Sequence, residues 1–553
     1  MLDNKITPED GSPAPRMPSR EPRLWLASLL LAAPFFLPYA SHFMTAPGRL
    51  PTGFIQYDMP YYMANAREHF DNGRFQFFYS NPFDPRYEAP AIYVQPMSLM
   101  LGMILHATGA DPGFLIIGFE ILAAWACARV ALALYAEIVG LGDWPRRLGL
   151  LAFFWGGGLL ALAGIGYSLA RQRTITDIFR FDPENGWWFL NFGRNLIYPT
   201  ESLYHAFFFG SILCLLRQRF MAGAALAFLT SLSHPFTGVE LLLILASWAA
   251  LELFYVRSKA VPLRFLIAIL GLLGVHFGYY LIYLTRFAEH RQLMETWKIA
   301  WELQAVNFLP AYALVGSLAF WSFRRSDIAL RFFSHPRNRL FLTWFVVAFT
   351  LANHEFAIRS IQPLHFERGY IWTALFFMGA TPLVDLLAYL QLRRPFVRVA
   401  ATGLVMATLV LDNALWLAQF PYAAMTGAKA QGFTVTETQK DVFAYLRRGE
   451  NRGSILLTSD PDLGYLGTVY TPLRSWVGHQ YNTPDVGTRK QEVAAFLGEG
   501  KLLEAWSGKT LLIVVERAAP DSRKPPAEGL QVVHENKDYA IYRLRVGDVP
   551  PPR

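Results

Sequence analysis

Long apolar runs are the feature that most limits what this chain can fold into. A helix needs about 17 to 25 mostly apolar residues to cross the hydrocarbon core of a bilayer. Runs of about this length lie at 24–43, 113–139, 147–169, 200–216, 237–256, 262–284, 306–323, 370–390 and 396–419. Shorter candidates lie at 220–235 and 339–353, and the run 91–108 is left undecided as a span. We therefore expect an α-helical polytopic membrane protein with about eleven to thirteen transmembrane helices.

The composition agrees with a membrane protein and excludes several other classes. Of the 553 residues, 53% are hydrophobic and 17% are charged, and the mean hydropathy is +0.24, which is too apolar for a soluble enzyme of this length. The formal net charge is +8, but Lys and Arg collect in the cytoplasmic loops of membrane proteins, so this charge does not indicate a nucleic-acid partner. Both cysteines, Cys127 and Cys214, lie in apolar runs, which argues against a disulfide framework or a cysteine metal site.

Positive charge predicts the orientation of the spans. Arg16, Arg20 and Arg23 precede the first apolar run, and no small-x-small cleavage site follows it, so we expect an uncleaved first span. With the N-terminus in the cytoplasm, Lys and Arg gather in the short connections on the same side, as the positive-inside rule requires. These residues are Arg146, Arg147, Arg217, Arg219, Arg257, Lys259, Arg264, Arg324, Arg325, Arg331, Arg337, Arg339, Arg393, Arg394 and Arg398. An odd number of spans then places the C-terminus outside the cytoplasm, and the expected location is the cytoplasmic (inner) membrane.

The composition changes after Phe420 to that of a soluble domain. Short β-rich runs at 454–459 (SILLTS) and 510–516 (TLLIVVE) flank a helical RKQEVAAFL at 489–497. The segment 530–544 predicts a hairpin with polar residues at its turn. A small extracytoplasmic α/β domain is therefore expected.

These patterns divide the chain into four parts. We expect a disordered cytoplasmic tail at 1–20, a transmembrane domain at 21–420 whose first outer loop is 45–90, an extracytoplasmic α/β domain at 421–548, and a tail at 549–553.

Ionisable residues concentrate at the expected outer face. The first outer loop carries Asp58 within PTGFIQYDMPYY (51–62), where it lies between Tyr57 and Met59. A carboxylate in such a semi-apolar setting can keep a pKa suited to proton abstraction, or it can bind a divalent metal. By contrast, a charge in a wet loop, such as Glu68, is usually only solvated.

Ionisable groups also lie within the predicted spans. Glu201, His205, Glu240 and Asp412 lie near outer ends, and His276 lies deeper. Burying such a group costs several kcal/mol unless it faces a cavity or a partner. Each is therefore either a functional residue or a hydrogen-bonding group between helices.

Several stretches resemble one family of membrane enzymes. GFIQYDMPYYMANAREHFDNGRF (53–75), followed by NPFDP and APAIYVQPMSLMLG, looks like the first outer loop of the GT-C superfamily of membrane glycosyltransferases, in its bacterial type. SLSHPFTGVELLL (231–243), LHFERGYIWTALFF (364–377) and TPLRSWVGHQYNTPDVGTRKQEVAAFL (471–497) agree with it. The resemblance implies a GT-C-like fold, a polyprenyl-phosphate-linked sugar as donor, and transfer on the extracytoplasmic face. It also favours 91–108 as a true span.

The resemblance implies roles for individual residues. Asp58 matches the catalytic acid of the family and would be the general base of an inverting transfer, and Glu88 could assist it, bind metal or orient the acceptor. A leaving phosphate needs fixed positive charge, which an Arg fork supplies best. The residues expected to bind the donor phosphate are Arg368 and His365, then Arg359 and Arg194; those that could contact the acceptor are His234, His205, Tyr61 and Tyr62.

Other assignments are left open by the sequence. Arg368 and its neighbours could instead anchor the chain at the interface by pairing with Glu367 or lipid headgroups. His479, with Arg474 and Asp485, could contact the acceptor or cap the membrane cavity. A divalent metal at Asp58, the sugar and the acceptor are not specified.

Two other functions compete with glycosyl transfer. A transporter or flippase would place ionisable residues near the bilayer midplane on broken helices in repeated halves, a pattern that this sequence lacks. A non-catalytic envelope-assembly protein would not need Asp58. Walker A, GxGxxG and HExxH patterns are absent, which argues against ATPase, dehydrogenase and zincin activities.

Overall fold

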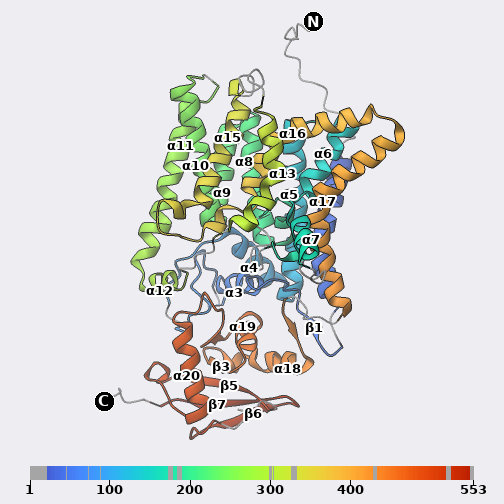
Figure 1. Cartoon of the computed structure of the whole chain (residues 1–553). Helices are drawn as coiled ribbons and strands as arrows, with labels where there is room; N and C mark the ends of the chain where they lie inside the picture. The colour runs from blue at the N-terminus through green and yellow to red at the C-terminus, as the bar shows by residue number, and fades with distance from the viewer. Residues whose placement is uncertain are drawn as a thin grey trace, which may run out of the picture.

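The structure is a computed structural model that describes residues 21–44, 47–71, 74–86, 89–171, 178–182, 190–258, 260–297, 302, 304–324, 333–426, 432–517 and 525–547. The tails expected at 1–20 and 549–553 lie outside these residues. A bundle of helices forms the upper part of the molecule and a sheet domain forms the lower part (Figure 1).

Every apolar run of the sequence contains a helix. The bundle helices are α1 (Glu21–Ala32), η1 (Ala33–Phe36), α2 (Leu37–His42), α5 (Pro112–Ile138), α6 (Trp144–Trp155), α7 (Leu160–Ala170), α8 (Pro199–Leu216), α9 (Phe220–Ser233), α10 (Pro235–Ala250), η4 (Leu251–Tyr255), α11 (Leu263–Phe277), η5 (Gly278–Tyr283), η6 (Leu284–Arg286), α13 (Ala305–Trp321), α15 (Pro336–Ala352), α16 (Tyr370–Gln391) and α17 (Pro395–Thr426).

Six helices of the described chain are long and apolar enough to cross a membrane, or seven if the bent pair α6 and α7 is one span. They are Pro22–His42, Pro112–Ile138, Pro235–Tyr255, Leu263–Arg286, Pro363–Gln391 and Pro395–Thr426. The shorter apolar helices α9 and α13 pack against α8 and α16 within the same bundle. The chain is thus a multi-pass helical membrane protein, as the sequence predicts, although the six or seven described helices that are long enough are fewer than the eleven to thirteen spans expected.

The run 91–108 falls short of a full span. It forms the 13-residue helix α4 (Pro96–Thr108), which at 1.5 Å per residue is about 20 Å long, against a hydrocarbon core of about 30 Å. α4 packs on α3 (Met59–Glu68) at the lower end of the bundle (Figure 1). The reading of this run as a true span, which the resemblance favours, is therefore not supported by its length.

The run 147–169 is broken at three glycines. α6 and α7 meet at an angle of 69°, and a Cβ on Gly158 would lie 2.3 Å from the carbonyl oxygen of Ala311. The carboxylate of Asp412 on α17 accepts hydrogen bonds from the N–H groups of Gly158, Leu160 and Ala161 at 2.8 to 3.1 Å. Asp412 therefore caps α7, which is the helix-to-helix role that the sequence left open for it.

The tail domain is a five-stranded sheet with helices on both faces. The strand order is β4-β3-β5-β7-β6, with β3 parallel to β4 and β5 and the other neighbours antiparallel. The elements are α18 (Glu437–Leu446), β3 (Ile455–Thr458), α19 (Pro461–Tyr470), β4 (Arg474–Ser475), α20 (Val486–Glu499), β5 (Thr510–Glu516), β6 (Gln531–Glu535) and β7 (Tyr539–Arg545). The predicted β-rich runs, helix and hairpin are all present.

The two faces of this sheet bury different cores. Leu456, Leu512 and Ile541 join a core that continues through α18 and α19 into the bundle. The residues next to these along the strands, such as Leu457 and Ile513, point to the other face and pack with α20 in a separate core. Because successive strand residues point to opposite faces, one sheet both closes its own core and extends that of the bundle.

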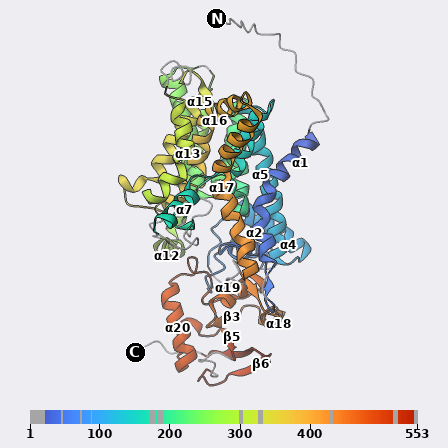
Figure 2. The same cartoon turned by 45° about the vertical axis from the view of Figure 1, so that its right-hand side comes forward.

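The first outer loop joins the bundle to the tail domain. β1 (Leu50–Pro51) pairs with β2 (Thr434–Val435), and α17 runs down to the tail domain in both views (Figures 1 and 2). A buried ion pair joins Arg474 of β4 to Glu68 of α3 at 2.7 Å. The tail domain and the first loop therefore form one packed layer at the lower end of the bundle.

Candidate active site

Asp58 lies at the start of α3, facing the tail domain. Pro60 occupies the first turn of the helix, where a residue without an N–H group is tolerated. Within the described residues the Asp58 carboxylate caps no N–H group of α3. Its Oδ1 instead lies 3.0 Å from Nε2 of His479, and its Oδ2 accepts from the Gln56 amide at 3.2 Å. The side chain is 39% exposed, so it remains accessible to a substrate.

His479 is held as a neutral donor. Its Nδ1 accepts hydrogen bonds from the backbone N–H groups of Tyr481 and Asn482 and from the Asn482 amide, at 3.0 to 3.2 Å. A nitrogen that accepts from three N–H groups carries no proton, so the ring proton lies on Nε2, which donates to Asp58. The side chain is 1% exposed. The loop that follows β4 therefore fixes both the tautomer and the direction of this imidazole.

Aromatic rings from both domains enclose the Asp58–His479 pair. The ring centroids of Tyr57, Tyr61 and Tyr465 lie 4.7, 5.4 and 5.1 Å from that of His479. The Tyr465 hydroxyl donates to the Tyr57 carbonyl oxygen at 2.6 Å and accepts from the Tyr61 N–H at 2.9 Å. The tail domain thus supplies one wall of the site.

Two opposing effects set the pKa of Asp58. Burial raises it, but the hydrogen bonds from His479 and the Gln56 amide and the charge of Arg368 together lower it below its ordinary value. Asp58 is therefore ionised at neutral pH. Burial and then the carboxylates of Glu201 and Asp58 raise the pKa of the Tyr62 phenol well above its usual range, so Tyr62 stays neutral between them.

Arg368 lies in a strained turn before α16. The turn follows η8 (Pro363–Phe366), and φ is +23° at Arg368 and +75° at Gly369. A Cβ on Gly369 would lie 2.8 to 2.9 Å from the backbone of Asn191, so only glycine fits there. Non-glycine residues with positive φ persist only where the surroundings require them.

The Arg368 guanidinium joins three elements at the lower end of the bundle. It is 3% exposed and donates to Glu201 Oε1 at 2.6 Å, to the hydroxyl of Tyr204, and to Nδ1 of His365. His205 bonds the Arg368 carbonyl oxygen at 2.9 Å through Nε2. The positive charge is thus fixed in place by α8 and by its own turn.

A histidine pair adjoins this guanidinium. The rings of His234 and His365 lie 5.5 Å apart, and His365 stacks on Phe236 at 4.6 Å. Nδ1 of His234 accepts from the Thr237 N–H at 3.2 Å, and Nδ1 of His365 accepts from Arg368. Because an accepting Nδ1 carries no proton, both rings bear their proton on Nε2 when neutral.

The acid and the guanidinium both lie close enough to Tyr62 to influence its phenol electrostatically. Arg368 is among the charges that lower the pKa of Asp58, and both groups act on the Tyr62 phenol. Of the predicted residues, the structure brings together Asp58, Tyr61 and Tyr62 on one side and Arg368, His365, His234 and His205 on the other.

The remaining predicted residues lie elsewhere. Arg194 is buried, bonds both Asp182 oxygens at 2.8 and 2.9 Å, and donates to Asn413, so a phosphate would have to displace these partners. Arg359 is exposed. Glu88 lies outside the described residues. His276 bonds the Ser231 hydroxyl at 2.7 Å, a contact between helices.

The sequence did not identify two residues of the site as partners of Asp58 and Arg368. His479 was expected only to touch the acceptor or cap the cavity, yet it bonds Asp58. Glu201 was one of several buried acids, yet it is the partner of Arg368. The first lies 421 positions from its partner and the second 167, so no local pattern links them. Among the described residues, no group of three or more His, Cys, Asp or Glu side chains could hold a metal ion.

No protein-family model and no curated protein matches the chain. Solved structures do. The chain resembles an archaeal oligosaccharyltransferase. The apo enzyme of Archaeoglobus fulgidus aligns with a TM-score of 0.49 and 11% identity over 90% of this chain and 70% of that chain. The same enzyme tethered to an acceptor peptide containing the NVT sequon gives 0.47 and 12%, over 90% and 69%.

A third structure, AglB of the same organism with an inhibitory peptide and a dolichol-phosphate, gives a TM-score of 0.40 and 13% identity over 90% and 70% of the two chains.

Proposed function

We propose that this protein is a membrane glycosyltransferase that transfers a sugar from a polyprenyl-phosphate donor to an acceptor hydroxyl. The observation that carries the proposal is that an accessible Asp58, bonded by His479, and a fixed Arg368 guanidinium, bonded by Glu201, both lie near Tyr62. A displacement at a sugar carbon needs a proton acceptor on one side and a stabiliser of the leaving anion on the other.

The Asp58 side would activate the acceptor. The acceptor oxygen bonds to the anomeric carbon as the bond from that carbon to the phosphate oxygen breaks, and both electrons of the broken bond leave with the lipid phosphate. The hydroxyl proton passes to an Asp58 oxygen and then to water. Because the transition state is oxocarbenium-like, the hydroxyl becomes acidic as its bond forms, and a carboxylate of lowered pKa can accept the proton late. Attack opposite the leaving group inverts the anomeric carbon.

The Arg368 side would hold the phosphate. Its guanidinium is a fixed cation, and the neutral rings of His365 and His234 carry Nε2 protons that can donate to phosphate oxygens. Glu201 and the Tyr204 hydroxyl fix the position of the guanidinium. Charge that is held in place before the reaction stabilises a developing anion without reorganisation.

The site faces the layer formed by the first loop and the tail domain, so we place the reaction on the extracytoplasmic side of the inner membrane, where charge patterning puts this loop. Arg359 and Arg194 are secondary candidates for the phosphate, and Glu88 for assistance to Asp58.

The test is release of lipid phosphate by the purified protein from a panel of polyprenyl-phosphate sugars, with and without membrane extract as acceptor source. Glycosyl transfer predicts acceptor-dependent release of lipid phosphate and a glycosylated product. Movement of intact donor between leaflets without release would identify a flippase and overturn the proposal.

A further inference from the structure

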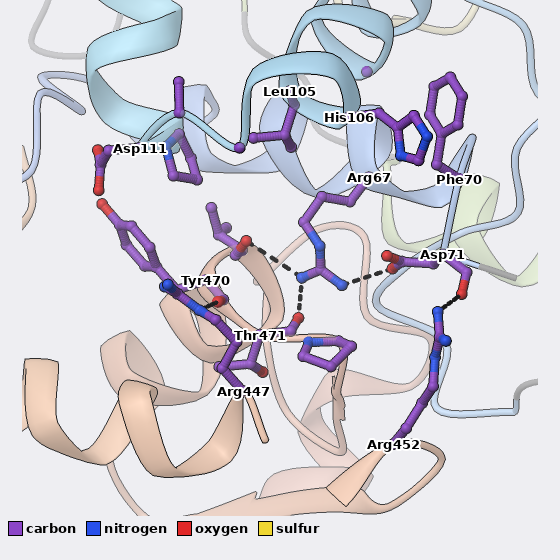
Figure 3. A pocket seen from close by; sticks show the side chains of 16 residues that line it. Arg67, Phe70, Asp71, Leu105, His106, Asp111, Arg447, Arg452, Tyr470 and Thr471 are labelled. Atoms are coloured by element: carbon purple, nitrogen blue, oxygen red, sulfur yellow. Dashed lines mark hydrogen bonds and ion pairs between the residues drawn. The ribbon is translucent and has the colours of Figure 1, made fainter. Parts of the chain in front are cut away.

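A pocket separate from the Asp58 site lies at the other end of α3 (Figure 3). Its volume is about 620 Å³. Three segments line it: the end of α3 with Arg67 and Phe70, the connection from α4 to α5, and the tail domain with Arg447 and Arg452. Since α3 has 10 residues and rises 1.5 Å per residue, this pocket is about 15 Å from Asp58.

Three arginines and two aspartates line the pocket, which leaves it with an excess of one positive charge. Asp71 is paired with Arg67 at 2.6 Å, and Asp111 caps α5 by accepting from the N–H groups of its first turn. Arg67 Nη1 also donates to three backbone carbonyls of the tail domain, so both terminal nitrogens of this guanidinium have protein partners. Arg447 and Arg452 each donate to a single backbone carbonyl in the described part of the chain. Both arginines line the pocket, and each guanidinium has further N–H groups that can donate.

The opposite wall, from α4 and the start of α5, is mostly apolar, with His106 and Asp111 as its polar residues, and it adjoins a candidate membrane span. Gly102 and Leu105 of α4 line the pocket, and Pro112 begins a candidate membrane span. The outward face of α4 exposes Met103 and Ile104. A nearby loop of the first outer segment exposes several phenylalanines, Phe75, Phe77 and Phe78, and Phe75 contacts Phe70 of the pocket at 5.5 Å. Exposed aromatic residues beside apolar helix ends are typical of the headgroup level of a bilayer.

We infer that this pocket binds the phosphate headgroup of an acidic membrane lipid. The arginine donors of the tail domain suit a phosphate anion, the apolar wall of α4 suits the acyl region, and the two meet at the level where headgroups lie. An inorganic phosphate would share the first interaction but not the second. Such a lipid would fasten the tail domain, and with it His479, against the membrane.

The test uses the full-length protein in nanodiscs of phosphatidylcholine with increasing phosphatidylglycerol, and follows thermal unfolding together with the lipid retained through purification. Arg447→Gln/Arg452→Gln removes the two donors. Lys501→Gln/Arg545→Gln is the matched control, because it removes two exposed charges of the same domain outside the pocket lining.

We expect phosphatidylglycerol to raise the unfolding temperature of the wild type and of the control. In the pocket variant, half-maximal stabilisation should need about 25-fold more phosphatidylglycerol, since each of the two basic residues at an acidic surface contributes roughly fivefold. Equal responses of the pocket and control variants would overturn the inference. So would the same stabilisation from inorganic phosphate in pure phosphatidylcholine discs, which would indicate a soluble anion site. Neither result depends on glycosyl transfer.

Discussion

His479 has two structural roles: its Nδ1 accepts hydrogen bonds that hold the loop after β4, and its Nε2 donates to Asp58. Replacing His479 with asparagine separates these roles. The asparagine amide oxygen takes the position of Nδ1 and can still accept from Tyr481 and Asn482, whereas no donor remains at the position of Nε2 to reach Asp58. His479→Gln is the complementary variant, since its amide nitrogen can reach the place of Nε2. Comparison of the two variants distinguishes loss of the hydrogen bond to Asp58 from loss of the loop conformation after β4.

The size of the effect follows from the geometry of the bond. A hydrogen bond to a charged group contributes about 1.5 to 3 kcal/mol. The side chain of Asp58 is 39% exposed, so water screens the bond and the lower figure applies. The bond also fixes the orientation of the carboxylate, and a loss of about 1.4 kcal/mol of this positioning in the transition state lowers kcat/KM about tenfold. We expect about this loss for His479→Asn at neutral pH and a smaller one for His479→Gln.

The pH dependence of kcat/KM distinguishes loss of the His479–Asp58 hydrogen bond from loss of folded protein. His479 helps to lower the pKa of Asp58, so its removal raises that pKa. The acid limb of kcat/KM, where Asp58 becomes protonated and stops accepting a proton, should therefore move to higher pH in His479→Asn. A lowered folded-state pKa stabilises the fold above the unfolded value, and this contribution disappears as the pH falls through the folded-state value. The two proteins should thus differ in free energy of unfolding at pH 7 and converge in strong acid. An unchanged acid limb with wild-type kcat/KM would refute the role given to His479.

Three further changes test other parts of the structure. Arg368→Lys keeps the charge but loses the planar fork, so we expect the KM for the lipid donor to rise at least tenfold in protein that is still folded at the assay temperature; an unchanged KM would remove Arg368 from phosphate binding. Arg474→Gln leaves the buried carboxylate of Glu68 unpaired and should cost about 3 to 5 kcal/mol in urea unfolding at pH 7. That cost should shrink at pH 5, where the unpaired Glu68 becomes protonated. Burial, which Arg474 only partly offsets, already raises the pKa of Glu68, and removal of Arg474 raises it further. A cost that does not depend on pH would contradict the Arg474–Glu68 ion pair. Gly369→Ala, at φ +75° and 2.8 Å from neighbouring backbone, should lower stability by about 2 to 4 kcal/mol in the same assay, whereas Gly403→Ala, with open space around it, should not destabilise.

The helices and the tail-domain strands could be predicted because their signals are local. Apolar runs of span length, the alternation in 454–459 and 510–516, and the polar turn of 530–544 each lie within one element. The break between α6 and α7 was missed, since three consecutive glycines inside an apolar run do not reveal that Asp412 of a distant helix caps the second half.

The two sides of the candidate site were predictable to different degrees. Asp58 stood out as an acid among aromatic residues, and Arg368 as a basic residue in HFERGY. Their partners did not stand out, because His479 and Glu201 come from segments far away in the sequence. Arg194 is the opposite case: its partner Asp182 lies only 12 positions away, so a local ion pair could have been weighed against phosphate binding.

The most direct test of the account is the rate of lipid-phosphate release by Asp58→Asn in full-length, folded protein. Asp71→Asn is the control, since it removes a carboxylate at the other end of the same helix. If Asp58 accepts the proton of the acceptor, Asp58→Asn should lose at least 100-fold in kcat, within the range of general-base contributions, with donor binding retained, and Asp71→Asn should remain active. An Asp58→Asn protein that transfers sugar at the wild-type rate would contradict the account.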